Sequence, residues 1–161
     1  MRSIALLALS LLIVPGCGGS SPTSATAPSS TPSFTSLMGG WSGSRLEVLT
    51  SGAASISTSC REVWSITSQT QGQFSGTFRV SGGTTAPCEG AGTVSGTVSA
   101  DNRISELAFS VDILTGGCTR SSGAGRYSGQ FANGSITATT SDSVACSNFT
   151  AARNLTITMS R

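Results

Sequence analysis

The sequence has no histidine and no lysine, and charged residues make up only 10% of its 161 residues. The absence of histidine removes the side chain most often used as a general base and as a metal ligand. The net charge is only +2, so the basic surface typical of a nucleic-acid-binding protein is missing. We therefore expect a protein that binds no metal, no other cofactor and no nucleic acid.

The seven acidic residues are scattered and form no catalytic pattern. Glu106 and Asp112 are loosely spaced in one predicted strand, and alternation places both on its outer face. Acid–base catalysis by two carboxylates needs both groups in one cleft. Serine is abundant, but there is no Gly-x-Ser-x-Gly turn and no histidine to activate a serine. The sequence therefore predicts a protein that is not an enzyme.

The first residues of the chain have the pattern of an export signal. Residues 1–16 contain a basic Arg2, an apolar run over 4–14 and a small Gly16 directly before Cys17. The apolar run of about 11 residues is too short to cross about 30 Å of hydrocarbon as a helix. An ordinary secretory signal, cleaved near Gly16, would leave Cys17 as a free thiol.

The same segment resembles the signal peptide of bacterial lipoproteins, in which a cysteine follows the cleavage site. The resemblance implies that Cys17 is diacylated, becomes the new N-terminus and is acylated again. Such chains anchor a protein stably, because each buried CH₂ contributes roughly 0.8 kcal/mol. Gly18 follows the cysteine where aspartate would favour retention in the inner membrane, so the resemblance implies the outer membrane. The domain would then lie in the periplasm or at the cell surface.

Residues 17–36 are predicted to form a lipidated, disordered tether. They are mainly Ser, Thr, Ala, Gly and Pro, and Phe34 is their one large apolar residue. Such a segment cannot bury enough apolar surface to offset the entropy lost on ordering. The remaining residues, 37–161, are long enough for one folded domain.

Apolar and polar residues alternate through most of this domain. In residues 74–80, for example, Phe, Gly, Phe and Val alternate with Ser, Thr and Arg. Alternation of this kind is typical of half-buried antiparallel strands. We predict eight strands, at residues 41–48, 61–68, 72–80, 91–99, 103–113, 124–132, 134–140 and 153–160.

The predicted connections alternate between short and long. Asn133-Gly134 is the strongest hairpin signal, and the connections at 69–72 and 100–102 are also tight. The connections at 49–60, 81–90, 114–123 and 141–152 would be long loops. In an up-and-down meander all long loops lie at one end. We therefore predict an all-β, eight-stranded antiparallel up-and-down barrel.

A short motif places a glycine inside four of the predicted strands. The motif has a large apolar residue, then Ser-Gly, and its glycines are Gly43, Gly76, Gly96 and Gly129. Glycine within a strand marks a bulge, a bend or a close backbone approach. Four such positions are typical of strands that coil sharply to close a small barrel. The alternative is that these glycines leave space for a ligand.

Four cysteines remain in the domain, which indicates disulfides in an exported chain. The meander brings all four to the long-loop end. Cys60–Cys88 with Cys118–Cys146 is the favoured pairing, and Cys88–Cys118 with Cys60–Cys146 is the alternative set of neighbours. No Cys-x-x-Cys spacing favours zinc.

Gly39-Gly40-Trp41, at the start of the first predicted strand, is similar to the Gly-x-Trp pattern of the calycins, the lipocalin-like and avidin-like barrels. The resemblance implies an eight-stranded barrel with a binding mouth at the loop end. In lipocalins an arginine near the chain end packs across this tryptophan. Arg153 or Arg161 would take that place here.

Three hypotheses for function follow. The first is an outer-membrane-anchored module that binds a small apolar ligand, with Trp41, Trp64 and Tyr127 as candidate lining residues. The second is a ligand-free barrel that serves as an envelope structural protein, a protein-interaction module or an inhibitor, in which these three residues are core. The third reverses the barrel, so that apolar residues face lipid and Ser and Thr line a lumen.

Overall fold

The computed structural model describes residues 32–83, 88–111, 118–120 and 126–161, and nine strands form within these ranges. The predicted signal peptide, Cys17 and most of the tether lie outside them. No helix among the described residues is long and apolar enough to cross a membrane. The strands are β1 (Gly39–Ser51), β2 (Ala54–Thr70), β3 (Gln73–Gly83), β4 (Gly90–Val98), β5 (Arg103–Phe109), β6 (Cys118–Arg120), β7 (Tyr127–Ala132), β8 (Ser135–Cys146) and β9 (Phe149–Ser160).

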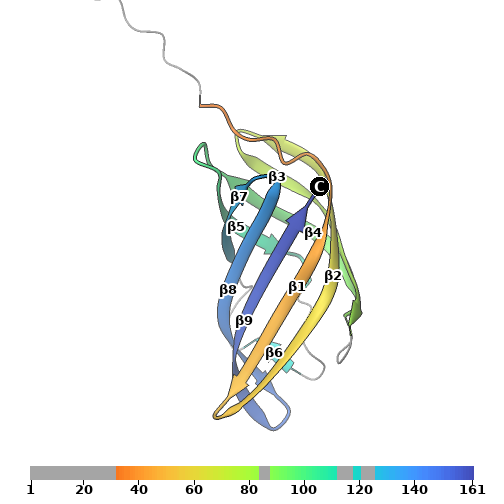
Figure 1. Ribbon diagram of the computed structural model, residues 1–161, viewed down its shortest axis with the longest axis vertical. Coiled ribbons are helices and arrows are strands. Elements are labelled where there is room, and N and C mark those ends of the chain that lie inside the picture. The colour runs from red at the N-terminus through yellow and green to blue at the C-terminus, as the bar shows by residue number, and fades with distance from the viewer. Residues whose placement is uncertain (1–31, 84–87, 112–117, 121–125) are drawn as a thin grey trace, which may run out of the picture. The chain divides into compact units, whose positions relative to one another are not determined.

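Eight of these strands form a closed antiparallel barrel (Figure 1). Their order is β8-β7-β5-β4-β3-β2-β1-β9, and the ring closes because β9 pairs with both β1 and β8. Neighbours in the barrel follow each other along the chain, apart from β6. The three-residue strand β6 pairs with the C-terminal part of β8, where Cys118 lies opposite Cys146. The predicted fold class is confirmed.

Alternation along the strands decides which residues fill the barrel. Ser65, Thr77, Thr93 and Thr158 are exposed on its outer face. Their neighbours in sequence point inward, because successive side chains of a strand point to opposite faces. The reversed barrel, with apolar residues outside, is therefore wrong. Each barrel strand contributes a large buried apolar residue: Trp41, Trp64, Phe78, Val94, Leu107, Tyr127, Ile136 and Ile157.

One end of the barrel is closed by the segment before β1. Leu37 is fully buried there, and its carbonyl oxygen accepts a 2.8 Å hydrogen bond from the indole N–H of Trp41. The Gln69 side chain on β2 also holds this segment. Its oxygen accepts from the Leu37 N–H and its nitrogen donates to the Thr35 carbonyl, both at 2.7 Å. The tight turn at Asn133-Gly134, with φ of 51° and 75°, is confirmed.

The glycines of the recurring motif lie where two strands approach closely. A Cβ atom on Gly76 would lie 2.0 Å from the backbone oxygen of Ser65, and one on Gly129 would lie 2.0 Å from that of Thr137. For Gly43 the nearest atom, the Thr158 oxygen, would be 1.8 Å away. Backbone therefore fills the space at these three positions, which confirms close approach.

Two of the predicted long loops are strands instead. The β1–β2 pairing continues to Ser51 and Ala54, and the β8–β9 pairing continues to Cys146 and Phe149. Each pair therefore ends in a two-residue turn, and the two hairpins extend away from the end where the chain terminates (Figure 1). The prediction failed because backbone pairing holds these segments together although few of their residues are large apolar ones.

β5 is also shorter than predicted. It ends at Phe109, and Val111 is exposed. The predicted strand position Ile113 lies outside the described residues. Alternation along the predicted strand 103–113 would place Val111 on the inward face with Leu107, and this expectation is wrong because the strand has already ended there.

Candidate functional site: a charged layer and an apolar hollow at the hairpin end

The three aromatic residues considered for ligand binding lie in the core. Trp41, Trp64 and Tyr127 are each at most 2% exposed. Phe109 contacts two of them, with ring centroids 5.8 Å from Trp64 and 5.2 Å from Tyr127. Trp41 packs edge-on against Phe131 with centroids 6.0 Å apart. Rings of this kind attract each other in such tilted and edge-to-face arrangements. Whether any of the three contacts a ligand stays a prediction.

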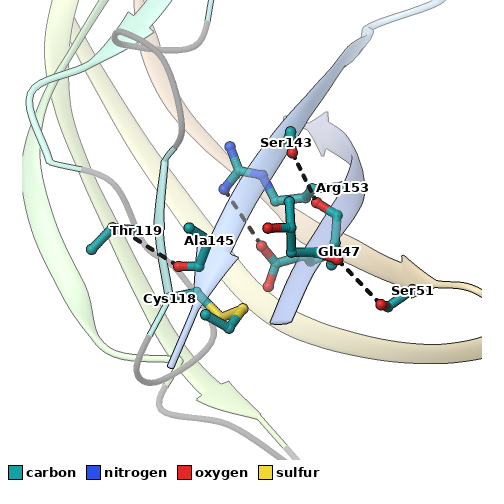
Figure 2. Close-up of a disulfide and its surroundings, with 10 residues drawn as sticks. Glu47, Ser51, Cys118, Thr119, Ser143, Ala145 and Arg153 are labelled. Carbon is teal, nitrogen blue, oxygen red and sulfur yellow. Dashed lines mark hydrogen bonds and ion pairs between the residues drawn. A yellow bond between two sulfur atoms is a disulfide. The ribbon is translucent and has the colours of Figure 1, made fainter. Parts of the chain in front are cut away.

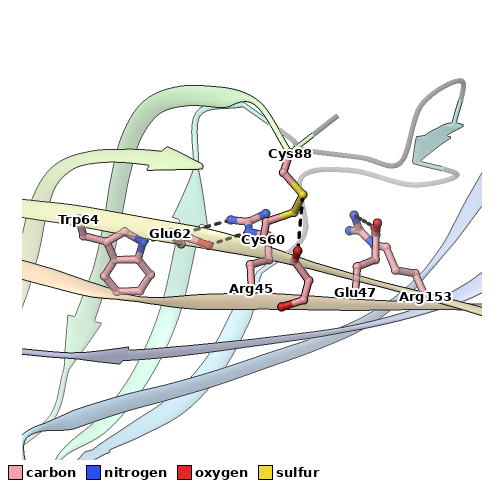
Figure 3. A network of polar contacts seen from close by, with 8 residues as sticks. Arg45, Glu47, Cys60, Glu62, Trp64, Cys88 and Arg153 are labelled. Atoms are coloured by element: carbon pink, nitrogen blue, oxygen red, sulfur yellow. Dashed lines mark hydrogen bonds and ion pairs between the residues drawn. A yellow bond between two sulfur atoms is a disulfide. The ribbon is translucent and has the colours of Figure 1, made fainter. Parts of the chain in front are cut away.

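A buried ion pair lies next to this aromatic cluster (Figure 3). Arg45 on β1 donates to both carboxylate oxygens of Glu62 on β2, at 2.7 and 3.2 Å. The indole N–H of Trp64 donates to the same carboxylate at 2.6 Å. The Arg45 guanidinium also lies 4.8 Å from the centre of the Phe109 ring. Glu62 is thus fully buried but has a donor for each oxygen.

Electrostatics keep Arg45 charged in this position. Burial disfavours the charged guanidinium, but the hydrogen bonds and the negative charge of Glu62 outweigh that effect. The pKa of Arg45 is raised above its ordinary value as a result. Removal of the Glu62 carboxylate would leave a positive charge in the barrel without its bidentate partner.

A second ion cluster lies closer to the hairpins. Arg153 on β9 forms a bidentate ion pair with Asp142 on β8, with N–O distances of 2.7 and 2.6 Å. A third contact, 3.5 Å long, joins Arg153 to Glu47 on β1 (Figures 2 and 3). The burial of Arg153 opposes its charge, yet the hydrogen bond and attraction of Asp142 raise its pKa above the ordinary value.

Together the two clusters form what we call the charged layer: Arg45, Glu47, Glu62, Asp142 and Arg153. Its carboxylates hold the two guanidiniums through ion pairs and charge-assisted hydrogen bonds. In the part of the chain that the structure describes, no group of three acidic or cysteine residues could hold a metal ion. The layer therefore joins β1, β2, β8 and β9 through ion pairs in the barrel interior.

The charged layer was not predicted from the sequence, although the alternation of inward and outward residues along β1 and β2 indicates it. Arg45 and Glu47 occupy the same phase of β1 as Trp41 and Leu49. Glu62 likewise shares the phase of Trp64 on β2. An ionisable residue in phase with buried apolar residues is the signal that would have found them.

Both favoured disulfides are present. Cys60 on β2 is bonded to Cys88 (Figure 3), and Cys118 on β6 is bonded to Cys146 on β8. Figure 2 shows the second bridge together with Glu47 and Arg153. Each bridge closes a sequence separation of 28 residues. The bridges therefore brace the half of the barrel from which the hairpins extend.

An apolar hollow of about 300 Å³ lies at the ends of the two hairpins. Ile56 and Phe149 border it and are 55% and 46% exposed. No charged residue occurs in residues 48–59 or 143–152, the two hairpin ends. The hollow is lined by Leu49, Ser51, Ala54, Ile56, Phe149 and Ala151. Exposed apolar residues gathered around a hollow are typical of an interaction surface.

A different hollow, of about 620 Å³, lies on the outer face of the barrel. Hydroxyl-bearing side chains such as Ser75, Ser95 and Thr97 line it, and the exposed ion pair of Glu106 with Arg126 borders it. Glu106 has a φ of +55° within an irregular part of β5. The hollow lacks exposed aromatic rings on which a sugar or base could stack, so its lining favours no particular ligand.

The calycin resemblance agrees with the structure at the closed end. Arg161, not Arg153, lies over the ring of Trp41. The closed eight-stranded antiparallel barrel is compatible with a lipocalin-like fold. No family model, curated protein or solved structure matches the chain.

Proposed function

We propose that this protein is a lipid-anchored, non-catalytic module of the bacterial cell envelope whose barrel acts through its surface. The observation that carries the proposal is the filling of the barrel. Four aromatic rings, Trp64, Phe78, Phe109 and Tyr127, meet in the interior, and the charged layer follows them toward the hairpins. A small barrel filled by its own side chains leaves its outer surface and its ends for binding.

The hairpin end is the best candidate for the binding surface. It combines exposed Ile56 and Phe149 with an uncharged rim, which suits contact with another protein. The tether joins the barrel at the opposite, closed end, where Leu37 and Thr35 are held by Gln69. The described residues directly before β1 therefore lie away from the hairpin end. An inhibitor of exported enzymes belongs to the same class of function.

Binding of a small apolar ligand is the second candidate, and the hollow at the hairpin ends favours it. Its volume of about 300 Å³ is at the lower end of the range of ligand sites. A ligand there would contact Ile56 and Phe149. It would not contact Trp41, Trp64 or Tyr127 unless the core rearranged.

Native mass spectrometry tests the choice between the two. The full chain, isolated from the membranes of a bacterial host in detergent, should show only the mass of the acylated protein. A further mass that leaves on denaturation would overturn the proposal and identify the ligand class. A Cys17→Ser chain whose residues 1–16 are replaced by an ordinary cleavable secretory signal, purified without detergent, repeats the measurement without acyl chains.

The anchor has its own test. Metabolic labelling with a palmitate analogue should label the protein, and the label should be lost in Cys17→Ser. The neighbouring change Ser20→Ala is the matched control and should keep the label. An unlabelled protein, released from membranes, would instead support the ordinary secretory signal.

A further inference from the structure

The first hairpin has an edge with no described strand beside it. β1 pairs with β2 along its whole length, down to Ser51 and Ala54. On the other side of β2 the pairing with β3 ends at Cys60 and Gly83. Within the described ranges, Ala54–Ser57 therefore form the free edge of a sheet. All four residues are exposed.

The turn geometry shows which backbone groups face away from β1. Gly52 has a φ of +59°, as the first central position of a type II′ turn requires. The residues flanking such a turn, Ser51 and Ala54, form a hydrogen-bonded pair. Because hydrogen-bonded and non-bonded pairs alternate, the N–H and C=O groups of Ser55 and Ser57 point outward. No strand within the described ranges pairs with these four groups, so a further strand could bind there.

This edge has none of the usual protection against strand pairing. Natural proteins guard their edges with lysine, proline, bulges or inward-pointing charges. Residues 48–59 contain no charged residue and no proline, and the β1–β2 register is unbroken. The edge is therefore open to strand addition, in which backbone hydrogen bonds provide much of the affinity.

Ile56 and the apolar hollow lie directly beside this edge. Ile56 is 55% exposed and borders the hollow, and its partner on β1 is Leu49, which also lines it. The surface thus presents an exposed apolar side chain and a hollow that could receive one. A surface that carries both is self-complementary, which is what a two-fold interface needs.

We propose that this edge binds a second copy of the chain, so that two β2 strands pair antiparallel about a two-fold axis at Ile56. Ser55 of each copy would then lie opposite Ser57 of the other, with four backbone hydrogen bonds between them. The two Ile56 side chains would lie opposite each other on the side of the hollows, where cross-strand pairs contact directly. The absence of charge favours a second copy as occupant, since two identical charged edges would repel each other.

This inference rests on the proposed surface-acting function and names the partner of its surface. The test uses the Cys17→Ser chain exported behind an ordinary cleavable secretory signal, which avoids detergent. Sedimentation equilibrium over a concentration series should show a monomer–dimer equilibrium. Ile56→Lys places two like charges opposite each other, and we expect it to weaken the dimer by roughly tenfold or more.

Val63→Lys is the matched control, because Val63 is an exposed apolar residue of the same strand with β1 and β3 paired on its two sides. It should leave the dimer unchanged, and equal melting temperatures of the two variants as monomers would show that both fold. In addition, Ile56→Cys should form a disulfide between two copies.

Three results would overturn the proposal: a monomer at all concentrations, a dimer that Ile56→Lys leaves intact, or a monomer that binds only an unrelated protein at this edge. A small molecule bound to the protein would instead overturn the proposed surface-acting function. The two failures are therefore distinguishable in native mass spectra of the same samples.

Discussion

Arg161 lies across the indole ring of Trp41, with its guanidinium carbon 4.5 Å from the ring centroid. The same guanidinium donates hydrogen bonds of 2.9 Å to the carbonyl oxygens of Ser36 and Met38. Arg161, the residue after β9, thus contacts the start of β1 and the segment before it. This contact fastens the closed end of the barrel at the place where its first and last strands meet.

The first prediction concerns this contact. Arg161→Ala should lower the free energy of unfolding by about 1–2 kcal/mol, because it removes a cation–π contact and two charge-assisted hydrogen bonds. Urea denaturation followed by tryptophan fluorescence measures the loss. Arg79→Ala, on the exposed face of β3, is the control and should change stability by less than about 0.5 kcal/mol. Equal effects of the two changes would contradict the stabilising role of Arg161.

The second prediction concerns the charged layer. Glu62→Gln removes the counter-charge of Arg45 in the interior and should cost about 3–5 kcal/mol of unfolding free energy. Glu106→Gln breaks the exposed pair with Arg126 and should cost at most about 1 kcal/mol. Urea denaturation of both variants tests the difference.

A double variant keeps this prediction testable if Glu62→Gln fails to fold. Arg45→Met combined with Glu62→Gln removes the orphaned charge, so it should be more stable than Glu62→Gln alone. A double variant less stable than the single one would show that burial of the Arg45 charge is not the cause.

The third prediction concerns close packing of backbone. Gly76→Ala would place a Cβ atom 2.0 Å from the Ser65 oxygen, so the two strands must separate. We expect a loss of about 1–3 kcal/mol, typical of overpacking. Gly40→Ala is the matched control, since no atom lies within 4 Å of its added Cβ. Thermal unfolding should show a lower midpoint for Gly76→Ala only.

The fourth prediction concerns pH. A hydrogen bond from the Ser99 hydroxyl, together with the nearby Arg103, lowers the pKa of Asp101 below its ordinary 3.8. A lowered pKa contributes stability at pH values above the ordinary pKa, and this contribution is lost as the pH falls through the lowered value. Ser99→Ala should move the Asp101 pKa back toward 3.8. An NMR titration of the Asp101 carboxyl carbon measures the shift, and an unchanged curve would contradict the prediction.

The barrel was predictable because its strands bury one face. Phe74 and Phe78, for example, alternate with polar residues and fall on the same interior face as expected. The hairpin ends were not predictable in this way. In residues 54–57 both faces of the strand are exposed, so burial leaves no alternation to detect. Their pairing comes from backbone hydrogen bonds and from the turn at Gly52, which are weak signals in a Ser- and Ala-rich segment.

The site was predictable only in part. The order of the strands limited the cysteine pairs to two sets of neighbours, and the favoured set is the one present. The partners of Glu62 did not, because alternation indicates that a residue points inward but not which residue of a neighbouring strand it meets. That choice depends on the register of β1 against β2, in which Arg45 lies opposite Cys60. The fold tests neither the lipidation of Cys17 nor the prediction that the protein is not an enzyme, and both stay predictions.

The arrangement of β1 has a mechanical consequence. β1 runs from the closed end to the hairpin end and is bonded to β2 over Gly39–Ser51 and to β9 over Ser42–Thr50. A load applied between the tether and the tip of the first hairpin would act along this strand. Its hydrogen bonds, which are perpendicular to the strand, would share the load in shear rather than break one at a time. The barrel should therefore resist a pull applied between its closed end and the tip of the first hairpin.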